Sequence, residues 1–571
     1  MSDKQYFTID NIEIELDKGL NVLEHAKKYG IDIPAFCYAP ELSIYGACRM
    51  CLVEIVDQKT GRISLDSSCS LLPKPGMVIK TNTSQLRMFR KNILELLITK
   101  HCQACTYCYS NQACKLQAFA KTYNIVYVRY PLLVKESKRD ATSPCISKDI
   151  AKCILCGLCI RMCSEVQKVG AIDFAHRGTD MVVACAGEKS LNESPCVGCG
   201  QCAAVCPVGA LDIKCDIAKL WKLLGDKTKK VSVQVAPAVR VAVGEAFGIP
   251  SEENTFGRLV AALRQIGFAE VYDTNTGADM TIIQEVAELF ERMKTKSKLP
   301  LFTSCCPSWV LFVEKNYPEL LPHLSSTKSP MHIFAATSKK EANADHVHGA
   351  IMPCTAKKFE CLRSEFNNDT SFVLTTQEII RMIKEASIDY AAIKPEEIEN
   401  KWGSASGAGQ LFGVSGGVME ACLRYVLYLV KYRISYRDIA AKVRGIPKVD
   451  PKAGALTEGI RSGEFELNGT KLSVAVASGL ANAAELIERI KGGEHFDFVE
   501  IMACPGGCIG GGGQPKASWE VKEKRAQGIY LAAENNPMKS AEHNPVMKEW
   551  CDLMGSKNAE HDHWHTSYIK K

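Results

Sequence analysis

The sequence predicts a multidomain protein of mixed α+β and α/β class, in which small cysteine-rich domains precede one large α/β domain. Three observations predict this organisation. The chain has 571 residues, enough for roughly three or four domains. Its 27 cysteines fall into closely spaced groups, most of them within the first 210 residues. After about residue 230, short apolar stretches alternate with segments of helical periodicity, which is typical of α/β units around a mainly parallel sheet.

The composition indicates a folded protein whose cysteines bind metal. Apolar residues make up 46% and charged residues 23% of the chain, as in ordinary globular proteins. The net charge of +6 is small for this length and argues against nucleic acid as the main partner. The N-terminal stretch MSDKQYFTIDNIEIEL has no secretory signal pattern, and no stretch reaches the roughly 18 apolar residues of a membrane span. We therefore expect a cytoplasmic protein, whose many cysteines stay reduced and serve as metal ligands.

The first cysteine group lies beside two predicted hairpins. The segments FTIDNIEIEL and CLVEIVDQKTGRISLD alternate apolar and polar residues around turn signals. The group consists of Cys37, Cys48, Cys51 and Cys69. It resembles a plant-type ferredoxin domain with a [2Fe-2S] cluster, here over residues 1–82, although the cysteine spacing differs from that of such domains. Four structural cysteines or a zinc site are the alternatives.

The second group follows a predicted helix, SQLRMFRKNILELLITK. It contains one histidine and three cysteines: His101, Cys105, Cys108 and Cys114. Alone, such a set binds zinc equally well. The motif resembles the His-ligated [4Fe-4S] module of [FeFe]-hydrogenases and of the electron-input subunit of respiratory complex I, here over residues 83–126. Cys102 is interpreted as a bystander.

The third group is a doubled run of the form C-x2-C-x2-C-x3-C, within residues 127–215. Pro207 follows the second run and Ser164 follows the first. In such pairs the fourth cysteine serves the other cluster, so we expect two [4Fe-4S] clusters with exchanged ligands. One cluster is assigned Cys153, Cys156, Cys159 and Cys206, and the other Cys196, Cys199, Cys202 and Cys163. Together with the first two groups, they predict a path for electrons through four clusters.

The C-terminal half carries its clustered cysteines directly after predicted strands. After the linker-like GDKTKK, the segments VSVQVA, EVYDT, KLPLFT, HGAIM, KLSVAVA and FDFVEI are typical of short buried strands, and FGRLVAALRQIGF of a helix. Ligands of such sheets bind at the carboxyl ends of the strands. The five cysteines found there are Cys305 and Cys306 in LFTSCCPSW, Cys354 in AIMPCTAKKFE, and Cys504 and Cys508 in IMACPGGCIGGGGQP. We expect these three loops to converge, and a zinc or cubane site would use four of the five thiolates.

The motifs TSCCPSW, MPCTAKKFE and MACPGGCIGGGGQP resemble the three signatures of [FeFe]-hydrogenases, and the N-terminal modules follow the order of the clostridial-type, multi-cluster members. The resemblance covers essentially the whole chain. It implies ferredoxin-like iron-sulfur domains followed by a catalytic α/β domain of two lobes over residues 216–571. It also implies an H-cluster: a [4Fe-4S] cube, joined through Cys508 to a di-iron unit with CO, cyanide and azadithiolate. The implied cube ligands are Cys306, Cys354, Cys504 and Cys508.

The glycines of the last motif would let main chain close around so large a group. A phosphate-binding loop is the alternative, but no Lys-Ser/Thr pair follows Gly513. By the resemblance, Lys357 donates to a cyanide ligand, whereas its neighbour Lys358 fits a surface lysine. The positions matching the pocket wall are Ala236, Pro237, Ala238, Pro330, Met331, Met352, Phe412 and Met502. The Met and Phe among them are equally typical of plain core.

The resemblance also implies a proton relay. Its members are Cys305, Glu285, Ser325, Glu288 and Arg292. The spacing of the two glutamates and the arginine places them near one helix face, which is also typical of an exposed salt-bridged helix. One departure is visible: the family commonly has Gln after the Ser-Pro, whereas this chain has Met331 and His332 after Ser329 and Pro330. Catalytic bias is therefore left open.

The function implied is the reversible reduction of protons to H2, with electrons exchanged with a soluble carrier such as ferredoxin. The resemblance also implies maturation enzymes that build the di-iron unit. A hydrogen sensor, an assembly factor or an electron-transfer protein without fast turnover is the alternative. The tail EHDHWHTSYIKK, with His561, His563 and His565, is expected to be a surface terminus.

Overall fold

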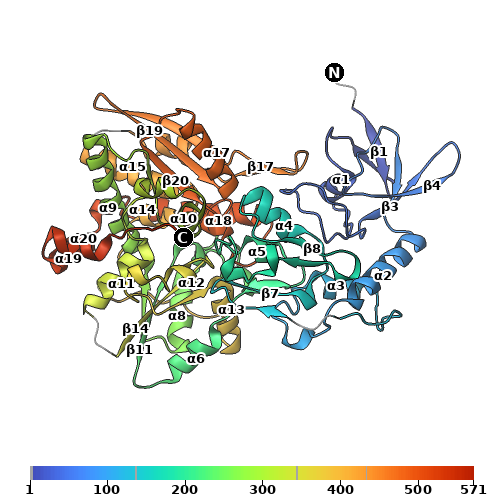
Figure 1. Ribbon diagram of the computed structural model, residues 1–571, viewed down its shortest axis with the longest axis horizontal. Coiled ribbons are helices and arrows are strands. Elements are labelled where there is room, and N and C mark those ends of the chain that lie inside the picture. The colour runs from blue at the N-terminus through green and yellow to red at the C-terminus, as the bar shows by residue number, and fades with distance from the viewer. Residues whose placement is uncertain (1–3, 135–137, 342–344, 401, 432–433) are drawn as a thin grey trace.

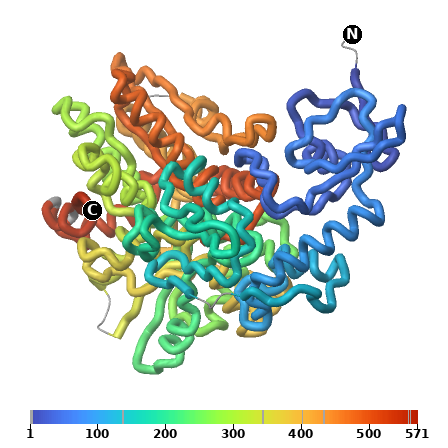
Figure 2. The backbone as a smooth tube through the Cα atoms, turned by 45° about the vertical axis from the view of Figure 1, so that its right-hand side comes forward, coloured from blue at the N-terminus to red at the C-terminus, as the bar shows by residue number. Residues whose placement is uncertain are grey.

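The computed structural model describes residues 4–134, 138–341, 345–400, 402–431 and 434–571. Figure 1 shows an N-terminal sheet domain at one side, a cysteine-rich middle region, and a large C-terminal part. The backbone tube in Figure 2 shows the same order, with the N-terminal domain set apart and the middle region packed against the C-terminal part. No helix formed by the described residues combines the length and the apolar character that a membrane crossing requires.

The N-terminal domain is a five-stranded sheet of order β2-β1-β5-β3-β4 with one helix against it. The two predicted hairpins are confirmed: β1 pairs with β2, and β3 with β4, both antiparallel. Asn21 caps the helix, because its side chain accepts a hydrogen bond from the Glu24 amide. The elements are β1 (Tyr6–Ile9), β2 (Ile12–Glu15), α1 (Val22–Lys28), β3 (Leu52–Val56), β4 (Ile63–Ser67) and β5 (Val78–Lys80).

The middle region begins with the predicted helix, α2 (Ser84–Thr99), capped by Thr83. Its doubled cysteine run forms two similar turns, in which Gly157 and Gly200 both adopt a φ of 70° directly before a short helix. Glycine adopts this left-handed conformation without strain. The further elements are α3 (Lys115–Thr122), β6 (Arg139–Asp140), β7 (Ile146–Asp149), α4 (Leu158–Arg161), β8 (Asp173–Ala175), β9 (Val182–Ala184), α5 (Gln201–Val205) and β10 (Leu211–Ile213).

The C-terminal part contains two four-stranded sheets, which form the two predicted lobes. The sheet of order β12-β11-β14-β15 is parallel throughout. The sheet of order β13-β20-β19-β18 is parallel except between β18 and β19. The strands are β11 (Lys230–Val235), β12 (Glu270–Asp273), β13 (Leu301–Phe302), β14 (His346–Met352), β15 (Phe372–Thr375), β18 (Ile460–Leu467), β19 (Thr470–Ser478) and β20 (Phe498–Met502), with a separate pair β16 (Lys448–Asp450) and β17 (Ala455–Thr457).

Helices cover both sheets, and the longest one connects the lobes. Helix α9 is buried on every side over its first residues, Thr274–Ile282, and packs against α11 and α15. The helices are α6 (Ile217–Gly225), α7 (Pro237–Arg240), α8 (Phe256–Ile266), α9 (Thr274–Thr295), α10 (Pro307–Asn316), α11 (Pro330–Glu341), α12 (Lys357–Glu360), α13 (Thr376–Glu385), α14 (Gly407–Gln410), α15 (Gly417–Leu429), α16 (Tyr436–Val443), α17 (Leu480–Lys491), α18 (Trp519–Asn535), α19 (Pro545–Met554) and α20 (Lys557–Trp564).

The C-terminal tail is only in part the surface terminus that the sequence suggests, because His561 and residues 569–571 are exposed. Trp564, however, is fully buried, and its indole Nε1 donates to Thr337 Oγ1 at 3.0 Å. The amide of Thr566 donates to the carbonyl of Ser326 at 2.7 Å. One apolar side chain among polar ones, Trp564, thus anchors the segment.

Candidate metal centre

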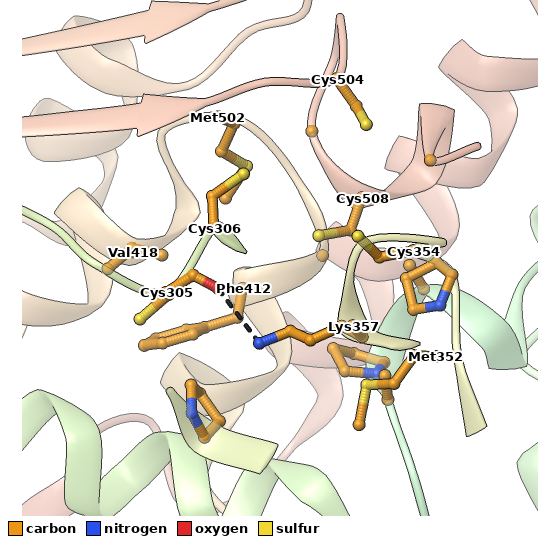
Figure 3. Close-up of a pocket in the computed structure, with 18 of the residues that line it drawn as sticks. Cys305, Cys306, Met352, Cys354, Lys357, Phe412, Val418, Met502, Cys504 and Cys508 are labelled. Atoms are coloured by element: carbon orange, nitrogen blue, oxygen red, sulfur yellow. Dashed lines mark hydrogen bonds between the residues drawn. The ribbon is translucent and has the colours of Figure 1, made fainter. Parts of the chain in front are cut away.

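Three cysteine-bearing loops meet at one cavity between the two lobes. They follow the carboxyl ends of β13, β14 and β20, where parallel sheets place their ligands. The thiols lining the cavity are those of Cys305, Cys306, Cys354, Cys504 and Cys508. Figure 3 shows these side chains entering a common space from separate loops. The cavity has a volume of about 90 Å³, whereas one water needs roughly 10–15 Å³, so a group of many atoms fits.

Glycine backbone forms one wall of this cavity. Gly507, just before Cys508, has a φ of 95°, which other residues rarely adopt. A Cβ atom at Gly511 would lie 2.2 Å from the Pro353 carbonyl, and one at Gly512 would lie 2.5 Å from the Cys199 carbonyl. Any side chain at these positions would therefore push the loops apart. The same contacts bring the second cysteine run of the middle region against this wall.

The donors in the cavity suit an iron-sulfur cluster. Burial raises the pKa of the cavity thiols, that of Cys354 to about 12, so an empty cavity would hold neutral thiols. Thiolates are the ligands of iron-sulfur clusters, and bound iron would compensate their charge. Among the described residues, no three His, Cys, Asp or Glu side chains are close enough to hold a single metal ion. The cysteines surround cavities instead.

The lysine expected to face the cavity does so, and it has an unforeseen partner. Lys357 Nζ donates to the Cys305 carbonyl at 3.2 Å (Figure 3). It also lies 2.6 Å from Glu360 Oε2. Burial opposes its charge, but Glu360 and the nearby thiols together raise the pKa of Lys357 above its usual value. The side chain therefore presents a fixed ammonium to the cavity. The sequence analysis missed Glu360, although its spacing of three from Lys357 on a helix was visible.

Lys358 is not at the surface, contrary to the sequence-based expectation. Its side chain is 3% exposed, and Nζ lies 2.8 Å from Glu378 Oε1 and 2.6 Å from Asp216 Oδ2. Both partners are distant in sequence. The two neighbouring lysines thus point in different directions: Lys357 faces the cavity, and Lys358 lies inside the core of the first lobe.

All pocket-wall positions expected from the resemblance line the cavity: Ala236, Pro237, Ala238, Pro330, Met331, Met352, Phe412 and Met502. The sequence analysis missed Glu500, which also lines it. Glu500 accepts hydrogen bonds from the amides of Gly416 and Met419, both at 2.7 Å, at the start of α15. Burial raises its pKa to about 7. The visible signal was an acid within the apolar strand FDFVEI.

The residues of the expected relay lie in one connected row beside the cavity. Ser325 lies close enough to Glu285 to lower its pKa, and the Ser325 hydroxyl donates to Glu288 Oε2 at 3.1 Å. Arg292 Nη2 donates to Glu288 Oε1 at 2.5 Å. Burial, followed by the charge of Glu288, raises the pKa of Glu285 to about 8, and burial together with Glu285 keeps Cys305 a neutral thiol. At pH 7 both groups therefore carry a proton.

Two further side chains adjoin these groups, Cys422 at Glu285 and His332 at Glu360. Cys422, which the sequence analysis did not single out, has its sulfur 4.0 Å from Glu285 Oε2. His332 is fully buried and stacks on Phe366 with ring centroids 4.0 Å apart, and its Nε2 lies 3.8 Å from Glu360 Oε2. Burial lowers the pKa of His332 far below its usual value, so the ring is neutral.

The doubled cysteine run lines two cavities in the middle region. One is lined by Cys153, Cys156, Cys159 and Cys206, and the other by Cys163, Cys196, Cys199 and Cys202. Each cavity thus has three cysteines of one run and the fourth of the other. The second cavity adjoins the glycine wall of the main cavity. The side-chain Nε2 of Gln201 donates to the Gly510 carbonyl at 2.8 Å, and the Thr355 hydroxyl donates to the Gly198 carbonyl at 2.7 Å.

The remaining two groups lie further from the main cavity. A third cavity is lined by His101, Cys105, Cys108 and Cys114, and also by the expected bystander Cys102. His101 Nδ1 lies 3.0 Å from the Lys152 carbonyl, so Nε2 is the nitrogen left for a metal. In the N-terminal domain, the Cys48 amide donates to the Cys37 sulfur at 3.5 Å, and Cys51 and Cys69 lie close enough to shift each other's pKa.

Four family models match consecutive parts of this chain. The iron only hydrogenase large subunit, C-terminal domain, matches residues 229–512. A 2Fe-2S iron-sulfur cluster binding domain matches residues 3–84, the iron-sulfur binding region of NADH-ubiquinone oxidoreductase-G residues 90–129, and a 4Fe-4S dicluster domain residues 152–210.

Relatives of known name align along the whole chain. The NADP-reducing hydrogenase subunit HndD of Solidesulfovibrio fructosivorans is 37% identical, over 99% of this chain and 98% of its own. Iron hydrogenase 1 of Clostridium pasteurianum is 33% identical, over 98% and 99%. The solved apo [FeFe]-hydrogenase from Chlamydomonas reinhardtii is 34% identical with a TM-score of 0.53, and covers 62% of this chain and 99% of its own. The similarity therefore includes both the cysteine-rich part and the large α/β part.

Proposed function

The chain belongs to the iron-only, or [FeFe], hydrogenase family, and from this premise we propose how it acts on H2. It is an oxidoreductase with iron-sulfur domains before its catalytic domain. We propose that it reduces protons to H2 reversibly, at an H-cluster held by Cys306, Cys354, Cys504 and Cys508. The convergence of these four thiols on one cavity, with Cys305 left over, is the observation that carries the proposal.

When bound, the H-cluster supplies the redox chemistry that joins two protons and two electrons. The protein supplies position, charge and protons. The ammonium of Lys357, fixed by Glu360, would hold anionic ligands of the cofactor on its side of the cavity. Met352, Met502 and Phe412 contribute apolar surface that excludes water. Cys305 holds a proton on its sulfur at the cavity wall and exchanges it with Glu285.

We assign the electron path to four accessory clusters in order along the chain. The domains proposed are 1–82 with one [2Fe-2S] cluster, 83–126 with one [4Fe-4S] cluster, 127–215 with two, and 216–571 with the H-cluster. The contact of Gln201 with Gly510 supports the last step of this path, because it joins the second cysteine run to the glycine wall. Maturation enzymes would build the di-iron unit, and the reduced cysteines fit a cytoplasmic location.

The electron partner proposed is a soluble carrier such as ferredoxin. A specific observation favours a second candidate: the relative that is 37% identical is named as a subunit of an NADP-reducing hydrogenase. The alternative electron partner is therefore a partner subunit that exchanges electrons with a nicotinamide nucleotide.

The test is H2 turnover of the full chain after maturation with its cluster-building enzymes. We expect infrared bands of CO and cyanide, H2 evolution with reduced ferredoxin, and H2 uptake with an oxidised acceptor. NADPH alone should not replace reduced ferredoxin as the electron donor, because the chain would need its partner subunit for that reaction. Bands without fast turnover would favour a sensor, and a chain without bands would contradict the proposed cofactor.

Replacing Glu285 by glutamine should remove a pH dependence of turnover. Because burial raises the pKa of Glu285 to about 8, the carboxyl is protonated at pH 7 and loses its proton as the pH rises through about 8. Proton delivery in the unchanged enzyme should therefore decline above this pH. Glutamine carries no transferable proton, so we expect turnover about 10²-fold lower and a pH profile without that inflection. An inflection that persists in the variant would assign it to another group.

A further inference from the structure

We propose that His565 is the outermost member of the proton relay: it exchanges protons between solvent and Glu288 through the hydroxyl of Ser326. The inference rests on the proposed function, because it extends the same relay by two residues. It gives a role to the C-terminal tail, which the family motifs leave unexplained.

The tail is held against the loop that carries the relay serine. The chain from Leu324 to Lys328 runs beside residues 564–566, with Thr327 and His565 paired as an antiparallel bridge. The Lys328 amide donates to the Trp564 carbonyl at 2.8 Å. Helix α20, which precedes this pairing, packs on α11, and Figure 1 shows α19 and α20 together at the outer edge of the catalytic part. The position of His565 is therefore determined by main-chain contacts on both of its sides.

A continuous row of hydrogen-bonding groups joins His565 to the relay. Its Nδ1 lies 2.8 Å from Ser326 Oγ. Ser326 Oγ lies 3.1 Å from Glu288 Oε2, and the Ser326 amide donates to the same oxygen at 3.0 Å. Ser325 reaches this oxygen from the inner side at 3.1 Å. Glu288 thus stands between an inner serine, which contacts Glu285, and an outer serine, which contacts His565.

The other oxygen of Glu288 is occupied by a permanent cation. Arg292 Nη2 donates to Oε1 at 2.5 Å and also donates to the Leu324 carbonyl at 2.8 Å. Arginine stays charged at any working pH, so it orients the carboxyl and transfers no proton. The exchangeable proton of Glu288 is therefore directed to Oε2, which faces both serines.

The surroundings of the His565 ring suit proton exchange with a carboxyl. Its Nε2 lies 3.1 Å from Gln284 Oε1 on α9, and the ring of His561 stacks on it with centroids 4.7 Å apart. The charged or titratable groups facing it are Glu288, His561 and Lys328. Burial lowers its pKa to about 4, so the ring is neutral at pH 7 and holds an extra proton only transiently.

The proposed step is a balanced double proton transfer. In the inward direction, the Nδ1 proton of the His565 imidazolium moves to Ser326 Oγ, while the hydroxyl proton of Ser326 moves to Glu288 Oε2. One N–H and one O–H bond break, and two O–H bonds form. An imidazolium and a carboxylate thereby become an imidazole and a carboxylic acid. Water or buffer then returns a proton to Nδ1 after the ring has turned away from Ser326, and outward transfer is the reverse.

The first test compares His565→Gln with a matched control two residues earlier, His563→Gln, at the end of α20. His563 Nδ1 lies 2.8 Å from the carbonyl of Ala559, and the side chain lies outside the relay. Glutamine retains a hydrogen-bonding side chain at 565 but carries no ionisable proton. We expect H2 turnover at low buffer concentration to fall about 10²-fold in His565→Gln, with unchanged CO and cyanide bands and melting temperature. His563→Gln should retain its turnover.

A second variant separates proton transfer from structure. In His565→Ala, added imidazole should restore a large part of the lost turnover, because a diffusing imidazole can protonate Ser326 and Glu288 directly. Loss of turnover that imidazole does not restore, with a lowered melting temperature, would show a structural role and overturn the inference.

A third measurement needs no bound cofactor. In the full-length chain without clusters, modification of His565 by diethyl pyrocarbonate, followed by peptide mapping across pH, reports the ionisation of the ring. We expect a pKa well below the usual value of a histidine, and a further decrease in Glu288→Gln, because Glu288 raises the pKa of His565. A usual histidine pKa at His565, unchanged by Glu288→Gln, would overturn the contact.

The outcomes distinguish a failure of the His565 role from a failure of the proton relay as a whole. If His565→Gln retains full turnover while Cys305→Ala loses it, only the role of His565 is overturned. If Cys305→Ala also retains full turnover, the relay itself is wrong.

Discussion

Replacing Cys305 by alanine is expected to lower H2 turnover by about 10²- to 10⁴-fold while leaving the H-cluster in place. The sulfur of Cys305 lines the cavity without being one of the four proposed cube ligands (Figure 3). Burial, followed by the charge of Glu285, raises its pKa, so at pH 7 it is a neutral thiol that carries a proton. Alanine removes this proton carrier, and it places no other titratable group between the cavity and Glu285.

The measurement pairs turnover with infrared spectra of the matured variant. Cys551→Ala is a suitable control, because that cysteine lies on α19 and lines none of the four cavities described above. The control should retain both turnover and spectrum. Loss of the CO and cyanide bands in Cys305→Ala would contradict the relay role and indicate that the thiol is needed to hold the cofactor.

Replacing Cys508 by alanine is expected to abolish H2 turnover altogether. Its thiol is the proposed shared ligand between the cube and the di-iron unit, and the glycines on either side of it let the main chain approach so large a group. Without that thiol, the di-iron unit has no bond to the protein. We therefore expect a variant that has no CO or cyanide bands and that retains the electron paramagnetic signals of its four accessory clusters.

A cysteine of the N-terminal domain provides the matched comparison. Cys69→Ala should lose only the signal of the [2Fe-2S] cluster and should retain the CO and cyanide bands, because Cys69 is far along the chain from the catalytic domain. If Cys508→Ala kept its infrared bands, the proposed attachment of the di-iron unit would be wrong. If both variants lost every signal, general unfolding would explain the result, and the melting temperature would reveal it.

Local features of the fold were predictable because they depend on neighbours in the sequence. The alternation in FTIDNIEIEL produces the hairpin of β1 and β2, and the helical spacing of SQLRMFRKNILELLITK produces α2. The apolar stretches KLSVAVA and FDFVEI form β19 and β20. Each of these patterns has a period that its own backbone geometry imposes.

The site was predictable where one sequence motif contains the cysteine ligands themselves. The doubled run has ligand spacing that only a few metal groups use, and its cysteines line two cavities with an exchange of the fourth residue. The three loops of the main cavity were also expected to converge, since each follows a strand of a parallel sheet. Periodicity and spacing carried these inferences without any knowledge of distances.

Contacts between distant residues were not predictable. The neighbours Lys357 and Lys358 are identical in type, yet one faces the cavity and the other pairs with Asp216, 142 positions away. His565 contacts Ser326 across 239 positions. No local pattern encodes such pairs, because the charge and burial of a side chain depend on what the folded chain places around it.

The amino-acid sequence by itself determined the family, the order of the domains and the cysteines available as ligands, because these depend on residue type and spacing. Only the tertiary structure decided which side chains are buried together: Glu360 with Lys357, Cys422 with Glu285, and the C-terminal histidine with the relay. The physical reason is that protonation and hydrogen bonding respond to distances of a few ångströms in space, which packing alone sets.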